Sequence, residues 1–219
     1  STLDETSLYI GQKYKDNVYV RSKFEAEKLI LMECQNGLVA SIYRIGNITN
    51  RFTDGLFQEN SKENAFLNRL IGFISLGMIP NEILNLNFEF TPVDICAKFI
   101  VSLIYCQDKN LKVYHLFNPN YITGKTLIDF VNTTTYKIKC TTFDEFKNTL
   151  ISSNKQYFGI TNYLNNLHNE NSIIIKSDIT DTYLSKNHLS WPKIDTNYMN
   201  KIINYIRTNK LIGGNTNEN

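Results

Sequence analysis

The sequence predicts an α/β protein, and three patterns lead to this prediction. Residues 17–31 have the composition of a helix, and a short apolar, β-branched run at 38–45 follows them. A second run of this kind lies at 112–117. A helix that leads into a buried, strand-like run is half of a β–α–β unit, in which the strands are parallel. At 219 residues the chain is long enough to bury a sizeable core.

The first predicted element is a helix that begins after Asn17 and ends close to Gly37. Asn17 is a favourable N-cap, and residues 25–29 are mostly strong helix formers. Gly37 suits the position just past a helix C-terminus. The preceding residues, 1–16, are polar and predict a loop.

Tyr19 and Lys23 lie four residues apart in this helix, so both side chains fall on one face. A free phenol has a pKa near ~10, and an ammonium within ~4–6 Å lowers it by favouring the phenolate. Such a pair can give a proton to a carbonyl oxygen as a hydride reaches the carbonyl carbon. The same spacing also occurs by chance, as a packed ring beside a solvated amine, so spacing alone leaves both interpretations open.

The strand at 38–45 ends at Gly46 and Asn47. Because ligands of open α/β sheets bind beyond the carboxyl ends of the strands, residues 44–48 lie where a cofactor or substrate could bind. A plain turn between strand and loop explains the same residues equally well.

A helix is predicted at 62–76, with Ser61 as its N-cap and Gly77 after its end. Its apolar residues form a broad stripe, and a stripe at helical spacing normally faces the protein core. We therefore expect most of this stripe to be core.

Three further elements follow in the middle of the chain. Apolar and polar residues alternate over 84–90, which predicts a half-buried strand. Thr91-Pro-Val-Asp94 opens a helix that runs to about residue 106, in which we expect Asp94 to be structural. His115 lies within the apolar run 112–117, so we expect a hydrogen-bonded core histidine rather than a catalytic one.

The rest of the chain predicts short elements and two irregular segments. We expect helices at 125–132, at 142–151 and from Thr196 onward, and strands at 136–140 and 173–176. Thr142 and Glu145 have the spacing of a capping box at the start of the second helix. Residues 163–172 predict a surface loop and residues 213–219 a disordered tail.

Composition excludes several classes of function. A net charge of +2 gives no electrostatic basis for nucleic-acid binding, and no apolar run reaches the ~18 residues of a membrane-spanning helix. The N-terminal residues do not have the pattern of a signal peptide. The four cysteines lack metal-binding spacing. We expect a reduced, cytoplasmic protein without a metal site.

Several motifs occur in an order that resembles one known family. They are the stretch Asn17-Val-Tyr-Val-Arg-Ser-Lys-Phe-Glu-Ala-Glu-Lys28, the lead-in Leu8–Gln12, and the blocks Tyr43–Ile48, Phe90–Asp94 and Tyr114–Pro119. Together they resemble the extended short-chain dehydrogenases/reductases, most nearly the terminal thioester reductase domains of nonribosomal peptide synthetases. Trp191-Pro192, before the last helix, resembles the same superfamily.

The resemblance implies the C-terminal portion of a Rossmann-type extended short-chain dehydrogenase/reductase fold, with a mostly helical substrate-binding subdomain. Residues 1–60 would be the end of the Rossmann-type core, and 61–212 the substrate-binding subdomain interleaved with the last core elements. The glycine-rich turn that holds a dinucleotide pyrophosphate is absent from the sequence, and in the family it precedes the Tyr-Lys helix. We therefore expect the isolated chain to be inactive.

The resemblance also implies residue roles. Tyr19 would donate the proton, and Lys23 would lower the pKa of Tyr19 and bind the nicotinamide ribose. Thr2 resembles the hydroxyl that binds the substrate carbonyl, although it lies closer to the tyrosine than in the family, and Ser7 is a second candidate. Backbone contacts to the nicotinamide would come from Arg44, Ile45, Gly46 and Asn47.

The implied activity is NADPH-dependent reduction of a thioester on the phosphopantetheine arm of a peptidyl carrier protein. The product would be an aldehyde, or an alcohol after a second reduction. NADPH rather than NADH follows from the family alone. Two alternatives stay open. One is another extended short-chain dehydrogenase/reductase, such as a sugar-nucleotide epimerase, a hydroxysteroid dehydrogenase or a fatty acyl reductase. The other is a non-catalytic module that docks a carrier protein.

Overall fold

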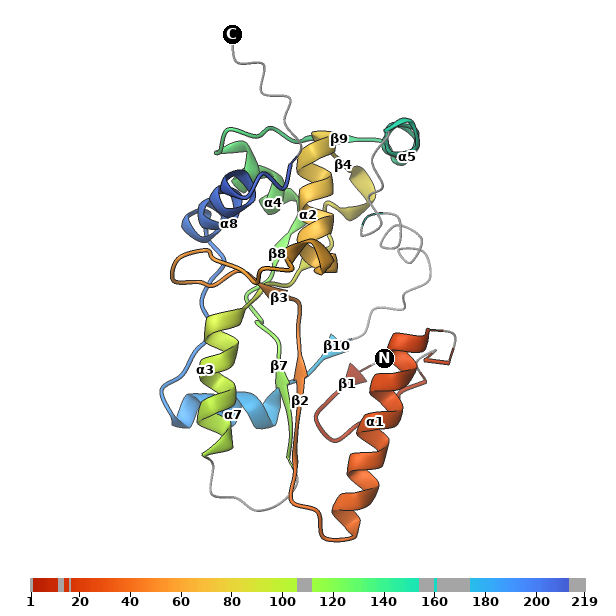
Figure 1. The fold of residues 1–219 in the computed structure, drawn as a ribbon, viewed down its shortest axis with the longest axis vertical. Coiled ribbons are helices and arrows are strands. Elements are labelled where there is room, and N and C mark those ends of the chain that lie inside the picture. The colour runs from red at the N-terminus through yellow and green to blue at the C-terminus, as the bar shows by residue number, and fades with distance from the viewer. Residues whose placement is uncertain are drawn as a thin grey trace. The chain divides into compact units, whose positions relative to one another are not determined.

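A computed structural model describes residues 2–11, 14, 15, 17–105, 112–153, 160 and 174–212 (Figure 1). These residues belong to two compact units. Unit 1 comprises Ser1–Gly46, Cys96–Phe117 and Glu170–Ser190, and unit 2 comprises Asn47–Ile95, Asn118–Asn169 and Trp191–Asn219. The predicted division of the chain at residue 60 stays a prediction.

Unit 1 is built around two pairs of parallel strands. In the larger pair, the register aligns Ser41 with Lys112 and Ile45 with Leu116. The elements of unit 1 are β1 (Thr2–Leu3), α1 (Val18–Gln35), β2 (Ser41–Ile45), most of α3 (Val93–Ile104), β7 (Lys112–Leu116), β10 (Ile174–Ile175) and α7 (Asp178–Lys186). Strand β1 pairs with β10, so the strand expected at 173–176 is confirmed, whereas the loop expected at 1–16 contains a short strand.

Helix α1 has the predicted ends. The Asn17 side chain accepts a hydrogen bond from the Val20 N–H at 3.1 Å, which makes Asn17 the N-cap. Gly37 follows the helix end with a φ of +101°, a left-handed conformation that favours glycine. No residue of α1 is buried.

The strand predicted at 38–45 is parallel, as expected, but it is shorter and more exposed than expected. Strand β2 covers only Ser41–Ile45, and none of its residues is buried. In the described part of the chain β2 pairs with β7 alone. A parallel strand is fully buried only when neighbouring strands and layers on both faces cover it, and β2 lacks part of this cover.

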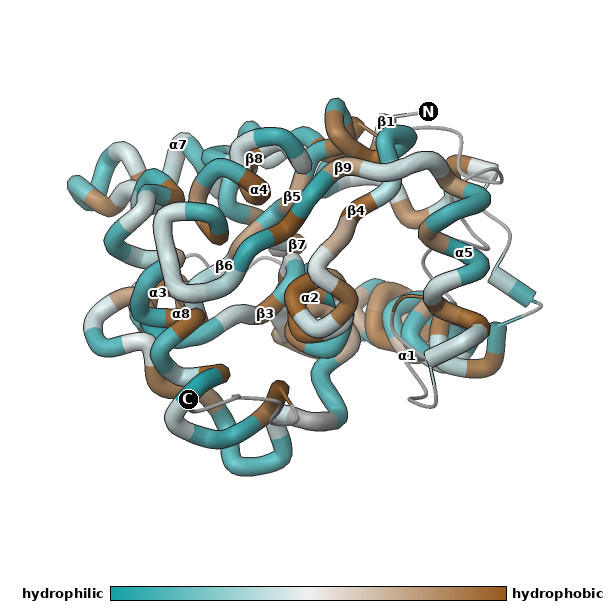
Figure 2. The backbone as a smooth tube through the Cα atoms, turned by 90° about the horizontal axis from the view of Figure 1, so that it is seen from above, coloured by the Kyte–Doolittle hydropathy of each residue, from teal (hydrophilic) through white to brown (hydrophobic). Residues whose placement is uncertain are grey.

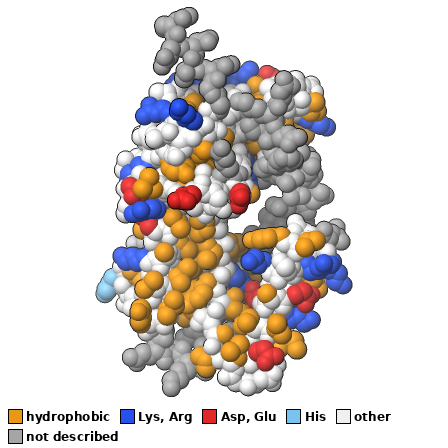
Figure 3. Space-filling view, in the orientation of Figure 1, with side chains coloured by type: hydrophobic (Ala, Val, Ile, Leu, Met, Phe, Trp, Pro, Cys, Tyr) orange, Lys and Arg blue, Asp and Glu red, His pale blue; other side chains and the backbone are white. Residues whose placement is uncertain are grey.

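Unit 1 exposes much apolar surface. Hydrophobic side chains gather over α3 and the neighbouring strands (Figure 3). On α3, Val101 is 54% and Ile104 is 61% exposed, and Tyr105 after the helix is 79% exposed. Apolar surface of this extent typically marks a contact with another protein segment.

Unit 2 contains the larger core and most of the helices. Its elements are β3 (Ile48–Thr49), the 3₁₀ turn η1 (Ser61–Glu63), α2 (Ala65–Leu76), β4 (Met78–Pro80), the 3₁₀ turn η2 (Asn81–Ile83), β5 (Asn87–Phe88), β6 (Thr91–Pro92), β8 (Ile122–Thr123), α4 (Gly124–Asn132), β9 (Lys139–Thr141), α5 (Phe143–Ser152) and α8 (Thr196–Thr208). Strands β3 and β6 and strands β4 and β9 pair in parallel, and β5 and β8 pair antiparallel.

Helix α2 is the centre of the unit 2 core. Hydrophobic residues occupy many positions of this helix (Figure 2). Seven of its residues are buried, namely Phe66, Leu67, Leu70, Ile71, Gly72, Phe73 and Ile74. The prediction that the apolar stripe at 62–76 is core is therefore confirmed. Gly77 ends the helix in the left-handed conformation, with a φ of +66°, as predicted.

Two predicted helix starts are wrong, one by three residues and the other by one. The N-cap of α2 is Asn64, whose side chain accepts the Leu67 N–H, because Ser61 begins a separate 3₁₀ turn. The N-cap of α8 is Asp195, whose carboxylate accepts the Tyr198 N–H at 2.8 Å, and Thr196 is the first helical residue. At each start the sequence offers two capping residues close together, and tertiary packing selects between them.

Other boundaries differ more. Only Asn87–Phe88 of the predicted strand at 84–90 is extended, because a 3₁₀ turn precedes it and the partner β8 is equally short. The strand expected at 136–140 begins only at Lys139. Helix α7 was not predicted. The loop at 163–172 and the tail at 213–219 lie outside the described residues.

The predicted capping box at the start of α5 is half formed. The Thr142 hydroxyl accepts the Glu145 N–H at 3.2 Å, as expected. The Glu145 carboxylate instead accepts hydrogen bonds from Thr141 and Lys139, which precede the helix. Within the described residues, no helix combines the length and apolar composition needed to cross a bilayer.

Candidate active site

The structure brings Tyr19 and Lys23 together on the first turns of α1. The Lys23 ammonium nitrogen lies 5.5 Å from the centre of the Tyr19 ring. Both side chains are exposed, Tyr19 to 70%. Water screens the interaction of two exposed groups, so the pair needs cover from further protein or ligand to act strongly on the phenol.

Arg44 of β2 connects α1 to the rest of unit 1. Its guanidinium forms an ion pair with Glu27 of α1 at 2.5 Å, and the two side chains are only 13% and 17% exposed. It also donates to the carbonyl oxygens of Asp4 at 2.9 Å and Ser7 at 2.6 Å. The remaining contact is with His115, at 2.8 Å. Arg44 therefore fixes α1 beside β2, and its guanidinium is fully used within the protein.

His115 is a hydrogen-bonded core histidine, as predicted. Its Nδ1 lies 2.7 Å from the carbonyl oxygen of Lys176, which can only accept, so Nδ1 carries the proton. Its Nε2 then accepts from Arg44. Burial lowers the pKa of His115, and the positive charge of Arg44 lowers it further, while the Lys176 carbonyl opposes the shift. The imidazole is therefore neutral and structural.

The two candidate hydroxyls lie on the segment before α1. Thr2 is exposed in β1, paired with Ile174, and among the described residues no hydrogen bond links it to Tyr19. The Ser7 hydroxyl donates to the Asp4 carboxylate at 2.7 Å, and this bond, together with that from Thr6, lowers the pKa of Asp4 to about 2. The Ser7 hydroxyl is thus occupied by a local turn.

Ile45 is the last residue of β2, and Gly46 and Asn47 follow it, as predicted. Ile45 is 41% exposed. The Gly46 N–H donates to the Leu116 carbonyl at 3.0 Å, and the Asn47 N–H donates to the Glu89 carboxylate at 2.6 Å. The Asn47 carbonyl also accepts the Thr91 N–H at 2.9 Å, so both backbone groups of Asn47 are used within the protein.

Asp94 is structural, as predicted. Its carboxylate accepts the N–H groups of Phe52 at 2.8 Å and Thr53 at 3.1 Å, and that of Ile95. Burial would raise the pKa of Asp94, but these hydrogen bonds outweigh burial and hold the pKa below its usual value.

Sequence reasoning missed two carboxylates that bind backbone N–H groups, the buried Glu5 and the half-buried Glu89. Glu5 accepts the N–H groups of Ile179 and Thr180 in the first turn of α7, so it stabilises that helix start. Glu89 accepts hydrogen bonds from Thr91 and from two backbone N–H groups. The available signal for Glu89 was a charged residue between apolar ones, whereas Glu5 lies in a polar segment that gives no such signal.

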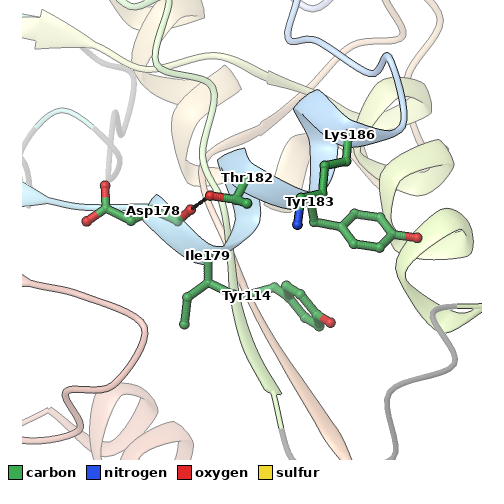
Figure 4. A pocket seen from close by; sticks show the side chains of 6 residues that line it. All are labelled: Tyr114, Asp178, Ile179, Thr182, Tyr183 and Lys186. Carbon is green, nitrogen blue, oxygen red and sulfur yellow. Dashed lines mark hydrogen bonds between the residues drawn. The ribbon is translucent and has the colours of Figure 1, made fainter.

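A cavity of about 440 Å³ lies beside α7 and β7 in unit 1 (Figure 4). Its lining residues are Tyr114, Asp178, Ile179, Thr182, Tyr183 and Lys186, and the Thr182 hydroxyl donates to the Asp178 carbonyl at 2.7 Å. None of the predicted site residues lines it, so we assign it no catalytic role.

The described residues fit only part of a nicotinamide dinucleotide. Tyr19, Lys23 and the end of β2 suit the nicotinamide and its ribose. A pyrophosphate needs a glycine-rich turn that opens a helix after a strand. Gly124 begins α4 after β8, but a Cβ there would lie 2.4 Å from the Ile83 carbonyl oxygen, so this glycine serves close packing of the backbone. The described part of the chain contains no other strand–glycine–helix start.

Metal chemistry has no candidate in the described part of the chain. No group of three or more His, Cys, Asp or Glu side chains is arranged there to hold an ion. The described cysteines, Cys34, Cys96 and Cys140, form no disulfide with one another, and Cys96 is buried.

Comparison with known proteins shows what the chain is similar to. Residues 1–100 match the NAD-binding family described as male sterility protein. The chain is 26% identical over 202 residues to a linear gramicidin synthase protein of Brevibacillus parabrevis, and the match covers 88% of the chain and 4% of that protein.

Two solved structures are similar over nearly the whole chain. A thiolation–reductase di-domain from an archaeal nonribosomal peptide synthetase has a TM-score of 0.85 and 28% identity, over 97% of the chain and 45% of that structure. The reductase domain of the aureusimine biosynthetic cluster has a TM-score of 0.82 and 27% identity, over 95% of the chain and 55% of that structure. The chain therefore spans about half the length of these reductase structures.

The chain has the mixed α/β fold of the reductase domains to which it is similar, as predicted, with helices dominating unit 2. These reductase domains have the extended short-chain dehydrogenase/reductase fold, and the chain aligns with about half of their length.

Proposed function

We propose that the chain provides the active-site and substrate-binding half of a reductase that acts on a carrier-bound thioester and uses NADPH. The observation that carries the proposal is the Tyr19–Lys23 pair, held at 5.5 Å on a helix that the Glu27–Arg44 ion pair fixes beside β2. The similarity to nonribosomal peptide synthetase reductase domains supports the same reaction class.

Tyr19 has the role of general acid in this proposal. The nicotinamide cofactor, when bound, supplies a hydride to the thioester carbonyl carbon. Tyr19 gives its phenolic proton to the carbonyl oxygen, so no free oxyanion accumulates. The C–S bond of the resulting thiohemiacetal then breaks, which releases an aldehyde and the phosphopantetheine thiol. A second hydride and proton would convert the aldehyde to an alcohol.

Lys23 has two roles in the proposal. Its ammonium would stabilise the Tyr19 phenolate after proton transfer once water is excluded. It would also donate hydrogen bonds to the ribose hydroxyls of the cofactor. Backbone groups at Arg44, Ile45, Gly46 and Asn47 would contact the nicotinamide. Thr2 is the proposed partner of the substrate carbonyl.

The test is Tyr19→Phe in the longer reductase that contains this chain. We expect a loss of kcat of about 10²–10⁴-fold, the usual contribution of a general acid, with the fold unchanged by circular dichroism. Tyr105→Phe, which removes the hydroxyl of another exposed tyrosine, is the matched control and should retain full activity. Near-wild-type turnover by Tyr19→Phe would refute the assignment.

Substrate class needs a separate measurement, because Tyr-Lys chemistry also serves other extended short-chain dehydrogenases/reductases. Rates with a carrier-bound thioester, a sugar nucleotide and a ketosteroid would be compared on the same longer enzyme. We expect turnover of the thioester alone. Preference for another class would leave the catalytic pair in place and remove the thioester assignment.

A second candidate function is favoured by the exposure of the catalytic pair. With Tyr19 70% exposed and no pyrophosphate site in the described residues, the isolated chain would dock a carrier protein without catalysis. Such a module predicts affinity for a phosphopantetheinylated carrier and none for NADPH.

A further inference from the structure

The half-buried carboxylate of Glu89 binds two segments of unit 2, each of which follows a parallel strand in the sequence. Strands β2 and β7 are in register, with Ile45 opposite Leu116. Two residues past this pair, the chain reaches Asn47 on one side and Asn118 on the other. These equivalent positions both donate their backbone N–H to Glu89, at 2.6 Å and 3.1 Å respectively.

Further hydrogen bonds tie the same three segments together. The Thr91 hydroxyl donates to the oxygen of Glu89 that also accepts from Asn118, and the Thr91 N–H donates to the Asn47 carbonyl at 2.9 Å. The Asn118 side-chain amide donates to the Phe90 carbonyl at 2.9 Å. Residues 89–91 therefore join the backbone at Asn47 to the backbone at Asn118 within unit 2.

We propose that Glu89 is a positioning residue, which holds the backbone after β2 and β7 in the shape that the ligand requires. Ligands of open α/β sheets bind beyond the carboxyl ends of parallel strands, and Asn47 and Asn118 follow directly after two such ends. This inference rests on the proposed function for its ligand, but not for its geometry.

Both carboxylate oxygens of Glu89 must act as hydrogen-bond acceptors. One oxygen of Glu89 accepts the Asn47 N–H, and the other accepts the Asn118 N–H and the Thr91 hydroxyl. In Glu89→Gln, the amide NH₂ must replace one of these oxygens. In either orientation it faces a backbone N–H, so one of the two strand ends loses its partner.

Burial opposes a charge at this position. It raises the pKa of Glu89, and the hydrogen bonds from Thr91, Asn47 and Asn118 partly offset the rise. A neutral side chain of the same size would avoid the free-energy cost of desolvating a charge at this half-buried position. The presence of a carboxylate despite this cost is consistent with a specific role for its two oxygens, which accept the N–H groups of Asn47 and Asn118.

The first test uses amide hydrogen exchange on the 219-residue chain, which needs no activity. In the wild type we expect the Asn47 and Asn118 amides to be protected. In Glu89→Gln at least one of them should exchange about tenfold faster or more. Glu145→Gln changes an exposed glutamate that accepts from Thr141 and Lys139, and it should leave both amides unchanged. Unprotected amides in the wild type, or unchanged exchange in Glu89→Gln, would overturn the inference.

The second test separates positioning from a merely structural role. In the longer reductase, Glu89→Gln should raise the KM for thioester or NADPH about tenfold and leave kcat nearly unchanged, because Tyr19 and Lys23 are intact. Faster exchange with an unchanged KM would make Glu89 structural only and refute positioning. An active Tyr19→Phe enzyme would refute the proposed function, while the exchange measurement would still decide the role of Glu89.

Discussion

His115 and Arg44 show how two ionisable side chains share a buried site at the scale of single residues. Glu27 pairs with the Arg44 guanidinium, and burial together with the neighbouring positive charge of Arg44 lowers the pKa of His115, so the imidazole stays neutral. A protonated imidazole would place a second positive charge and a donor against the guanidinium. The site therefore tolerates one cation, and acid disrupts it.

The pH dependence of stability tests this arrangement. Because the folded pKa of His115 lies below the ordinary value of 6.5, the unfolded chain binds more protons between the two values. The stabilisation is complete above pH 6.5 and is lost as the pH falls toward the folded pKa. The thermal unfolding midpoint of the wild type should fall between about pH 7 and about pH 5, and it should fall less in His115→Gln.

His188→Gln, which removes an exposed imidazole, is the matched control for that experiment. Nitrogen NMR of the wild type should show a neutral His115 ring with the proton on Nδ1. A charged His115 ring at neutral pH would show that the site holds two cations. An identical loss of stability in His115→Gln would show that protonation of His115 does not cause the pH dependence.

At the scale of elements, α1 is attached by few interactions. None of its residues is buried, so the hydrophobic effect contributes little to its position within unit 1. What holds it is the Glu27–Arg44 pair and a ring cluster in which Phe24 stacks on Tyr14 at 4.0 Å. Because Tyr19 lies on this helix, the position of its phenol, the proposed general acid, depends on these contacts.

Removing the ion pair should measure this attachment. Glu27→Ala leaves the Arg44 guanidinium without its carboxylate, so we expect a loss of about 1–3 kcal/mol in the free energy of unfolding by urea. Glu25→Ala, an exposed change on the same helix, should cost less than about 0.5 kcal/mol. Equal effects of the two substitutions would show that Arg44 does not hold α1.

At the scale of the whole molecule, the chain corresponds to about half of the reductase structures it resembles. Exposed side chains on α1, such as Leu29 and Met32, and the apolar surface over α3 suit contact with further protein. The proposed catalytic pair and the nicotinamide end of the site lie in this chain, whereas a pyrophosphate site is missing from its described residues.

Calorimetric titration of the 219-residue chain with NADPH tests this division. We expect no measurable binding at millimolar cofactor, because the pyrophosphate has no helix N-terminus to receive it among the described residues. The longer reductase, titrated under the same conditions, is the positive control. Clear binding by the short chain would mean that a pyrophosphate site lies within these residues.

The sequence predicted local structure wherever a few neighbouring residues decide it. The N-cap Asn17, the helix end at Gly77 and the parallel strand at 41–45 follow from capping chemistry, left-handed glycine and β-branched composition. The facing of Tyr19 and Lys23 follows from helical spacing alone. The family resemblance, carried by motif order, was also evident from the sequence.

Only the tertiary structure decided which distant residues meet. The partner of Arg44 is Glu27 rather than a ligand, and Glu89 binds Asn47 and Asn118 rather than facing solvent. The strand expected at 84–90 is mostly irregular, although its sequence alternates. Long-range contacts cause these differences, because hydrogen bonds between segments and burial by neighbouring elements outweigh local propensity and leave no periodic signal in the chain.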